Sequence, residues 1–227
     1  MLRLALLATC ACCAACDAVL HLEKVPPPPD APTICFSDHF DSDVIDPDRW
    51  TFTEVAGGTS VVQTGGQLVF TLAQTVSYAN LVSMPVDFEG SAIEIELVQA
   101  PVEDGHEEIG LELASDQNNA YTLYSANGSL FFRERMAGQP DIETSIQYSP
   151  SLHRYLRIRH ETAGTPTVHF ETSADRVTWK EHASVAANVP VTSAAARVYA
   201  GTYAEPGPPS TAICDDFAMT GRCPPPP

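Results

Sequence analysis

The chain has 227 residues, of which 44% are hydrophobic, and its 29 acidic and 12 basic residues give a formal net charge of −17. That charge opposes binding to phosphate backbones and to anionic lipid headgroups, so nucleic acid is not an expected partner. The hydrophobic share is ordinary for a globular protein, and the chain is long enough to bury a core without a metal or a disulfide.

The first sixteen residues predict an export signal and not a part of the folded domain. Arg3 supplies the positive start, residues 4–15 form an apolar run too short to span a bilayer, and Cys16 follows two alanines. This pattern resembles a bacterial lipoprotein signal, which implies lipidation of Cys16 and attachment to the cell envelope through the lipid alone. Cys10 is a second candidate for the modified cysteine, and secretion without an anchor is the alternative location.

Proline-rich stretches flank the remaining sequence. Residues 17–33 contain four consecutive prolines and predict an extended polyproline II linker that holds the domain away from its anchor. Residues 224–227 are all proline and predict a tail without backbone donors. A single folded domain, residues 34–223, is expected between them.

From residue 34 onward, apolar and polar residues alternate with a period of two, as in residues 92–97 and 107–113. Such alternation is typical of half-buried β-strands, and turn residues separate the segments. Asn127-Gly128 is the strongest hairpin signal, because a type I′ turn needs positive φ at both central positions. Many short strands without helical segments predict an all-β fold, either a two-sheet antiparallel sandwich or a closed barrel.

Three segments resemble the concanavalin A-like jelly rolls, a superfamily of lectins, glucanases and laminin G-like modules. They are the hairpin and turn of residues 156–179, the first predicted strand at residues 36–42 and the last at residues 213–221. The resemblance implies one concanavalin A-like β-sandwich in which the first and last strands lie side by side. Related domains bind sugars or proteins, and many of them hold a structural calcium ion.

The three cysteines that follow the leader cannot all pair with one another. Cys35 opens the first predicted strand and Cys223 closes the last, so a disulfide between them would join the chain ends if these strands are antiparallel. A bond between Cys35 and Cys214 is the alternative. Cys214 lies in an apolar run and is predicted to be a small buried hydrophobic residue.

Glu94 and Glu96 are the best candidates for catalysis. Their equal strand parity places both carboxylates on one face about 7 Å apart, within the range at which paired carboxylates act as acid and base. Concanavalin A-like glucanases carry their acids as Glu-x-Asp-x-Glu, and the third carboxylate is missing here.

Further acidic residues near Glu94 and Glu96 indicate a solvated surface, which leaves carboxyl pKa values unshifted. These neighbours are Glu103, Asp104, Glu107, Glu108 and Glu112. We therefore expect Glu94 and Glu96 to be polar strand residues, with Arg133 and Arg135 as cross-strand partners.

Aromatic residues are few, which limits the candidates for a sugar-binding surface. Tyr121 and Tyr124 are candidate ligand contacts, because an aromatic ring can stack under a sugar, although their opposite parity keeps them from facing one groove without a bulge. Trp50 and Trp179 are expected to be core residues.

Charged residues suggest one metal site and one set of ion pairs. Asp38, Asp41, Asp215 and Asp216 would converge if the first and last strands are neighbours, and carboxylate oxygens suit Ca²⁺. A structural calcium ion is the only cofactor that this pattern suggests. The expected surface ion pairs join a strand that carries Arg157, Arg159 and Glu161 to the facing His169 and Glu171.

Together these features predict a non-catalytic, envelope-anchored binding module whose partner is a glycan or an envelope protein. One alternative is a glycoside hydrolase or lyase that uses Glu94 and Glu96. A second alternative is a structural or adhesion protein that binds protein partners at its sheet edges.

Overall fold

The computed structural model describes residues 34–101, 106–204 and 210–221. The predicted leader, the lipidation at Cys16, the linker and the proline tail lie outside these residues and stay predictions. All described residues belong to one compact unit, Thr33–Pro227. In this part of the chain, no helix has the length and apolar character needed to cross a membrane.

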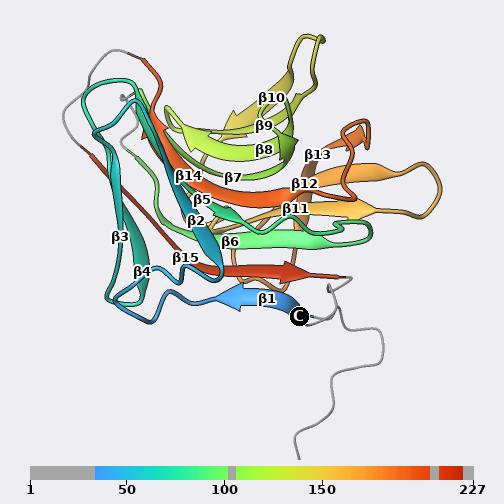
Figure 1. Ribbon diagram of the computed structural model, residues 1–227. Helices are drawn as coiled ribbons and strands as arrows, with labels where there is room; N and C mark the ends of the chain where they lie inside the picture. Colours follow the sequence, from blue (N-terminus) through green and yellow to red (C-terminus); the bar gives the residue numbers. More distant parts are fainter. Residues whose placement is uncertain (1–33, 102–105, 205–209, 222–227) are drawn as a thin grey trace, which may run out of the picture. The chain divides into compact units, whose positions relative to one another are not determined.

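The described residues form two antiparallel β-sheets and contain no helix, so the predicted sandwich is confirmed (Figure 1). In spatial order, sheet A consists of β13 (Lys180–Ala186), β12 (Thr167–Ser173), β11 (Tyr155–Glu161), β6 (Ala92–Gln99), β15 (Thr211–Thr220), β4 (Gln67–Thr71) and β3 (Ser60–Thr64), with β1 (Ile34–Asp38) paired to β15. Sheet B consists of β10 (Ile142–Gln147), β9 (Ser129–Arg135), β8 (Asn119–Ala126), β7 (Glu107–Asp116), β14 (Ala195–Thr202), β5 (Ser77–Ser83) and β2 (Trp50–Val55).

The core lies between the two sheets, where the apolar half of each alternating strand meets the other sheet. Leu111 and Val198 of sheet B and Ile93 and Phe170 of sheet A are all buried there. Each buried methylene contributes about 0.8 kcal/mol to folding, so these apolar rows hold the layers together. The polar half of each strand is left on the outer face of its sheet.

The two tryptophans differ in their surroundings. Trp50 is buried as predicted, and its ring packs edge-on against Phe217 with 4.9 Å between centroids. The prediction for Trp179 is wrong, because this residue is only half-buried and its ring lies 3.9 Å below the Arg157 guanidinium. Trp179 stands just outside β13, so the alternation that buries strand residues does not extend to it.

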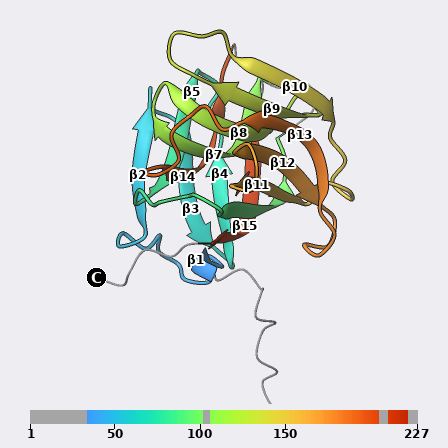
Figure 2. The ribbon, with the colours of Figure 1, turned by 90° about the vertical axis from the view of Figure 1, so that its right-hand side faces the viewer.

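The turns and chain ends follow the sequence pattern. Asn127 and Gly128 have φ values of 49° and 68° and join β8 to β9, as a type I′ hairpin requires. The first and last strands, β1 and β15, are antiparallel neighbours (Figure 2). Cys214 is a free, buried thiol, which excludes its pairing with Cys35. Cys223 lies outside the described residues, and its bond to Cys35 stays a prediction.

Figure 1 shows β7, β8 and β9 as bent strands, so that sheet B curves with its concave side turned away from sheet A. β7 runs between β8 and β14 near the middle of this sheet. Side chains on the outer side of β7 are therefore flanked by side chains from β8 and β14.

Candidate functional site

Glu94 and Glu96 lie on the outer face of sheet A, and each is bound by its own arginine. Arg176 donates to Glu94 through Nε at 2.7 Å, and Arg154 donates to Glu96 through Nε at 2.7 Å. The two carboxylate side chains are only 14% and 8% exposed. Both carboxylates are therefore bound by arginine. The structure adds no support for a catalytic role of Glu94 and Glu96, which stays a hypothesis.

The predicted partners of Glu94 and Glu96 are wrong. Arg133 and Arg135 belong to β9 of sheet B, whereas the strands that flank β6 are β11 and β15 of sheet A. The order of strands in a sandwich depends on contacts between segments that are far apart in the sequence. Local sequence therefore could not show that these arginines lie on the other sheet.

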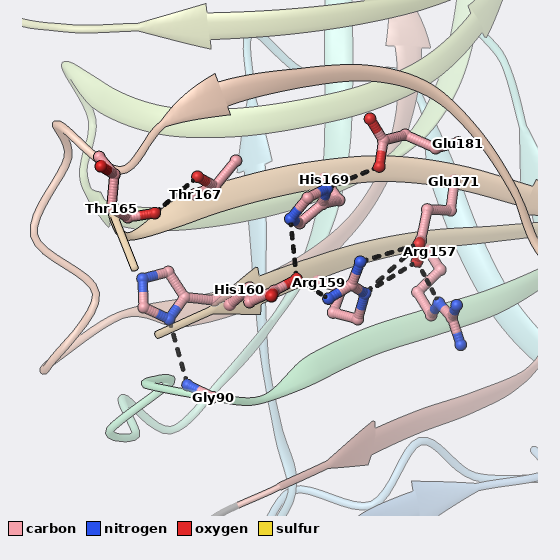
Figure 3. Close-up of polar contacts among 10 residues, drawn as sticks. Gly90, Arg157, Arg159, His160, Thr165, Thr167, His169, Glu171 and Glu181 are labelled. Atoms are coloured by element: carbon pink, nitrogen blue, oxygen red, sulfur yellow. Dashed lines mark hydrogen bonds and ion pairs between the residues drawn. The ribbon is translucent and has the colours of Figure 1, made fainter. Parts of the chain in front are cut away.

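Charged side chains on the outer face of β11, β12 and β13 also pair with one another (Figure 3). Arg157 and Arg159 both donate to Glu171, the first at 2.6 Å, and His169 contacts Glu181 at 2.7 Å. Burial works to raise the pKa of Glu171, but the arginine hydrogen bonds outweigh it and hold that pKa below its ordinary value. The predicted shared face is confirmed, and it forms a network of ion pairs.

The two candidate tyrosines on β8 point in opposite directions, as their parity predicts. Tyr121 is fully buried in the core, where its hydroxyl accepts a hydrogen bond from the backbone N–H of Val189 at 2.9 Å, so it presents nothing to a ligand on the outer face. Tyr124 lies on the outer face of sheet B. Its ring stacks on Phe131 with centroids 4.9 Å apart, and its hydroxyl donates to Glu143.

Three of the four aspartates proposed for calcium, Asp38, Asp215 and Asp216, accept hydrogen bonds from or contact protein groups. Asp38 accepts hydrogen bonds from the Trp50 indole at 2.8 Å and from a backbone N–H, and Asp216 contacts His39. Burial raises the pKa of Asp215 to about 6. Within the described ranges, no three His, Cys, Asp or Glu side chains are grouped so that they could hold a metal ion. The predicted cluster is therefore not formed by these residues.

A different pair of carboxylates occupies the outer face of sheet B. Glu108, Gly110 and Glu112 alternate along β7 and share that face, while Ile109 and Leu111 point into the core. Glu108 is only 7% exposed and Glu112 only 3%. The expectation of a solvated acidic surface is therefore wrong for both residues, because side chains from β8, β9, β5 and β14 cover them.

Three neighbouring groups bind the Glu112 carboxyl group. Arg197 binds one of its oxygens, while Arg135 at 3.2 Å and the Thr122 hydroxyl at 3.1 Å bind the other. Hydrogen bonds between charged groups are shorter and stronger than neutral ones, and here they compensate for the burial of the carboxylate.

Glu108, in contrast, forms no ion pair within the described part of the chain. Burial raises its pKa to about 7, against the opposing influence of the Arg133 guanidinium and of the Tyr199 and Tyr78 hydroxyls. A carboxyl group with that pKa carries its proton over much of the acidic to neutral range. The two glutamates of β7 therefore differ in their partners, because Glu112 is bound by two arginines and Glu108 is not.

Two glycines allow tyrosine rings to lie across this face. Gly110 stands opposite Tyr124 and Tyr199 on the flanking strands, and Gly201 stands opposite Tyr78. A Cβ atom at Gly110 would lie 2.6 Å from the Tyr124 Cβ, and one at Gly201 would overlap the Tyr78 ring. Only glycine fits at these two positions.

A groove of about 490 Å³ runs along the outer face of sheet B beside these residues. It is lined by Thr53, Val55, Tyr78, Asn80, Glu112, Gln117, Arg133, Arg135, Arg197 and Tyr199. Tyrosine rings supply flat surface, and arginine, asparagine and threonine supply hydrogen-bonding groups. Such a mixture suits a polar ligand with apolar ring faces, as a sugar has.

One signal in the sequence could have found this face. The glucanase pattern Glu-x-Asp-x-Glu has its outer acids four residues apart, and Glu108 and Glu112 have the same spacing with Gly110 in the middle. The surrounding acidic residues suggested solvent exposure instead, since burial by neighbouring strands cannot be read from the local sequence.

No family model and no curated protein matches this chain. Solved structures do match it. A β-glucanase of Bacillus licheniformis gives a TM-score of 0.62 at 10% identity, covering 82% of this chain and 98% of that chain. An immunostimulatory antigen and pseudo β-1,3-glucanase of Mycobacterium tuberculosis gives 0.59 at 12% identity, covering 83% and 99%.

A third similar structure is a glycosyl hydrolase family 16 protein of Mycobacterium smegmatis, with a TM-score of 0.59 at 13% identity, covering 82% of this chain and 100% of that chain. These likenesses extend over nearly the whole described domain, and at such low identity they establish the fold. The chain has the two-sheet jelly-roll fold of these structures.

Proposed function

We propose that this protein is a glycoside hydrolase that holds a glycan in the groove on the outer face of sheet B. The observation that carries the proposal is a pair of buried carboxyl groups on one face of β7, of which Glu112 is bound by two arginines and Glu108 forms no ion pair with the described residues. Glycosidases cleave with such a pair, in which a protonated acid serves the leaving oxygen and a carboxylate attacks the sugar or activates water.

In this proposal the two glutamates have different roles. Glu108 keeps its proton up to about pH 7 because it is buried, which suits a general acid. Glu112 is bound by Arg135 and Arg197, an arrangement that suits a nucleophile or a base. Tyr78 and Tyr199 line the groove and offer rings to the apolar face of a sugar. The glucanases among the similar structures support the choice of substrate class.

A second candidate function is glycan binding without hydrolysis. It is favoured by Glu112, whose two oxygens are already bound by protein groups, and by Glu108, which lies beside the groove without lining it. Gly110 also leaves no room for an acid at the middle position of the glucanase pattern. One of the similar structures, from M. tuberculosis, is itself described as a pseudo β-1,3-glucanase.

One experiment separates the two functions. Release of reducing sugar is measured from neutral and acidic polysaccharides with the wild-type protein and with Glu108→Gln, Glu112→Gln and the control Glu96→Gln. Removing either proposed catalytic group lowers the rate by about a thousandfold, while the control stays within about twofold of wild type. Circular dichroism confirms that each variant is folded.

Two outcomes would contradict hydrolysis at this face. Undiminished cleavage by Glu108→Gln and Glu112→Gln would place the chemistry elsewhere. Binding of a glycan by the wild type without cleavage of any polysaccharide would establish the second candidate instead.

A further inference from the structure

The groove on sheet B differs in charge from the rest of the molecule. Acidic residues outnumber basic ones by 29 to 12 in the whole chain. Among the residues that line the groove, however, there are three arginines and a single glutamate. Three of the 12 basic residues of this acidic protein therefore line the same groove.

Two of these arginines form ion pairs, although the buried Nε–H of Arg135 has no hydrogen-bond partner among the described residues, and the third forms no ion pair with them. Arg135 and Arg197 both bind Glu112. Arg133 forms no ion pair with any described residue, its buried Nε–H has no hydrogen-bond partner among them, and its guanidinium lies 5.0 Å from the centre of the Tyr124 ring. A buried donor without a partner is unfavourable, because it has lost its hydrogen bonds to water. Arg133 thus has unused capacity to bind an acceptor.

The acidic groups nearest to Arg133 do not remove this capacity. Glu143 faces it from β10 in register, but the Glu143 carboxylate accepts a hydrogen bond from the Tyr124 hydroxyl at 2.8 Å. Glu112 is bound by the other two arginines, and Glu108 is protonated over the acidic range. The guanidinium therefore stands over an aromatic ring as a cation without a paired anion.

We propose that the groove binds an acidic saccharide and that Arg133 recognises its carboxylate or sulfate group. The planar guanidinium matches both anions with two parallel N–H donors, and the neighbouring tyrosines contact the sugar rings. This proposal depends on the glycan site proposed above but not on hydrolysis there.

The negative charge of the whole protein does not prevent such binding. At physiological ionic strength, charges farther than about 8 Å from one another are largely screened. The acidic surface then acts weakly on an anion in the groove, whereas Arg133 acts at contact. The repulsion predicts slow association at low salt, and the specificity comes from the groove itself.

The test uses pairs of polysaccharides that differ only in charge. Polygalacturonate is compared with its carboxyl-reduced form, and carrageenan with its desulfated form, by titration calorimetry against the wild-type chain. We expect the acidic member of one pair to bind about tenfold to a hundredfold more tightly than its neutral form. Loss of the preference on carboxyl reduction identifies a carboxylate, and loss on desulfation identifies a sulfate.

Variants then locate the recognition. Arg133→Gln removes the preference for the acidic form, and Arg133→Lys, which keeps the charge but not the planar donors, retains part of it. Arg154→Gln, on the outer face of sheet A, is the matched control and leaves binding unchanged. Thermal unfolding of each variant shows that the fold is intact.

Three results would overturn the inference: no binding of either acidic polymer, equal binding of charged and neutral members, or an unchanged preference in Arg133→Gln. The outcome is distinguishable from that of the proposed function. Selective binding of the acidic form without cleavage supports Arg133 and contradicts hydrolysis, while cleavage of neutral polymers alone supports hydrolysis and contradicts the acidic ligand.

Discussion

The outer faces of the two sheets carry similar residues in different settings. On sheet A, Glu94 and Glu96 of β6 each have an arginine of their own. On sheet B, Glu112 of β7 is bound by two arginines. Glu108 of the same strand forms no ion pair with any described residue. The comparison teaches that strand parity selects which carboxylates share a face, whereas the neighbouring strands decide which partners bind those carboxylates.

The faces differ in their backbone as well. Gly110 and Gly201 make room on sheet B for the rings of Tyr124, Tyr199 and Tyr78. On sheet A, by contrast, the side chains of β11 and β12 are joined by salt bridges across the strands (Figure 3). The outer face of sheet B thus consists of tyrosine rings that lie over glycines, whereas the outer face of sheet A consists of paired charged side chains.

The largest expected effect on stability comes from filling the glycine positions of sheet B. In Gly201→Ala the new Cβ meets the Tyr78 ring and the backbone oxygen of Ser77, so we expect a loss of about 3 kcal/mol in the free energy of unfolding. Gly138→Ala is the control. It has open space around it and only an unfavourable φ of 76°, so its loss is about 1 kcal/mol. Urea unfolding measures both, and equal losses would show that the rings do not depend on glycine.

The ionisation of Glu108 predicts a pH dependence. Its pKa is raised from 4.5 to about 7 in the folded state, so the unfolded chain releases this proton first as the pH rises between those values. The free energy of unfolding therefore falls by about 2 to 3 kcal/mol over that range and changes no further above it. Glu108→Gln removes this contribution and is more stable than wild type at pH 8. Parallel pH profiles of the two proteins would contradict the assignment.

A smaller difference is expected between the arginines of the two faces. Arg197→Gln leaves Glu112 buried with one arginine, and we expect a loss of about 2 kcal/mol. Arg154 is 54% exposed, so water can replace it at Glu96 and Arg154→Gln loses less than about 1 kcal/mol. Thermal or urea unfolding checks the order. A larger loss in Arg154→Gln would reverse our description of the two faces.

The sequence predicted the fold because its signals are local. Alternation set the strands, Asn127-Gly128 set a hairpin, and the terminal segments set the pairing of β1 with β15. The site could not be predicted in the same way. Glu108 was assigned to a solvated surface because its burial depends on Tyr78 and Tyr199, which lie far away in the sequence.

Similar reasoning explains the errors at other positions. Arg133 was expected beside Glu94, but the strand order of the sandwich places it on the opposite sheet. Trp179 was expected in the core, but it lies just before β13. Outside a strand, the alternation of apolar and polar residues does not predict which way a side chain points. In each case the missing information was which strands become neighbours.

The central claim is that the outer face of sheet B, and not that of sheet A, receives the ligand. Nuclear magnetic resonance of the protein with labelled tyrosine rings tests it directly, using the polysaccharide fragment that binds most tightly in the calorimetric series. We predict that the ring signals of Tyr78 and Tyr199 shift on titration while the signal of Tyr155, on sheet A, does not. A shift of Tyr155 with Tyr78 and Tyr199 unmoved would contradict the account.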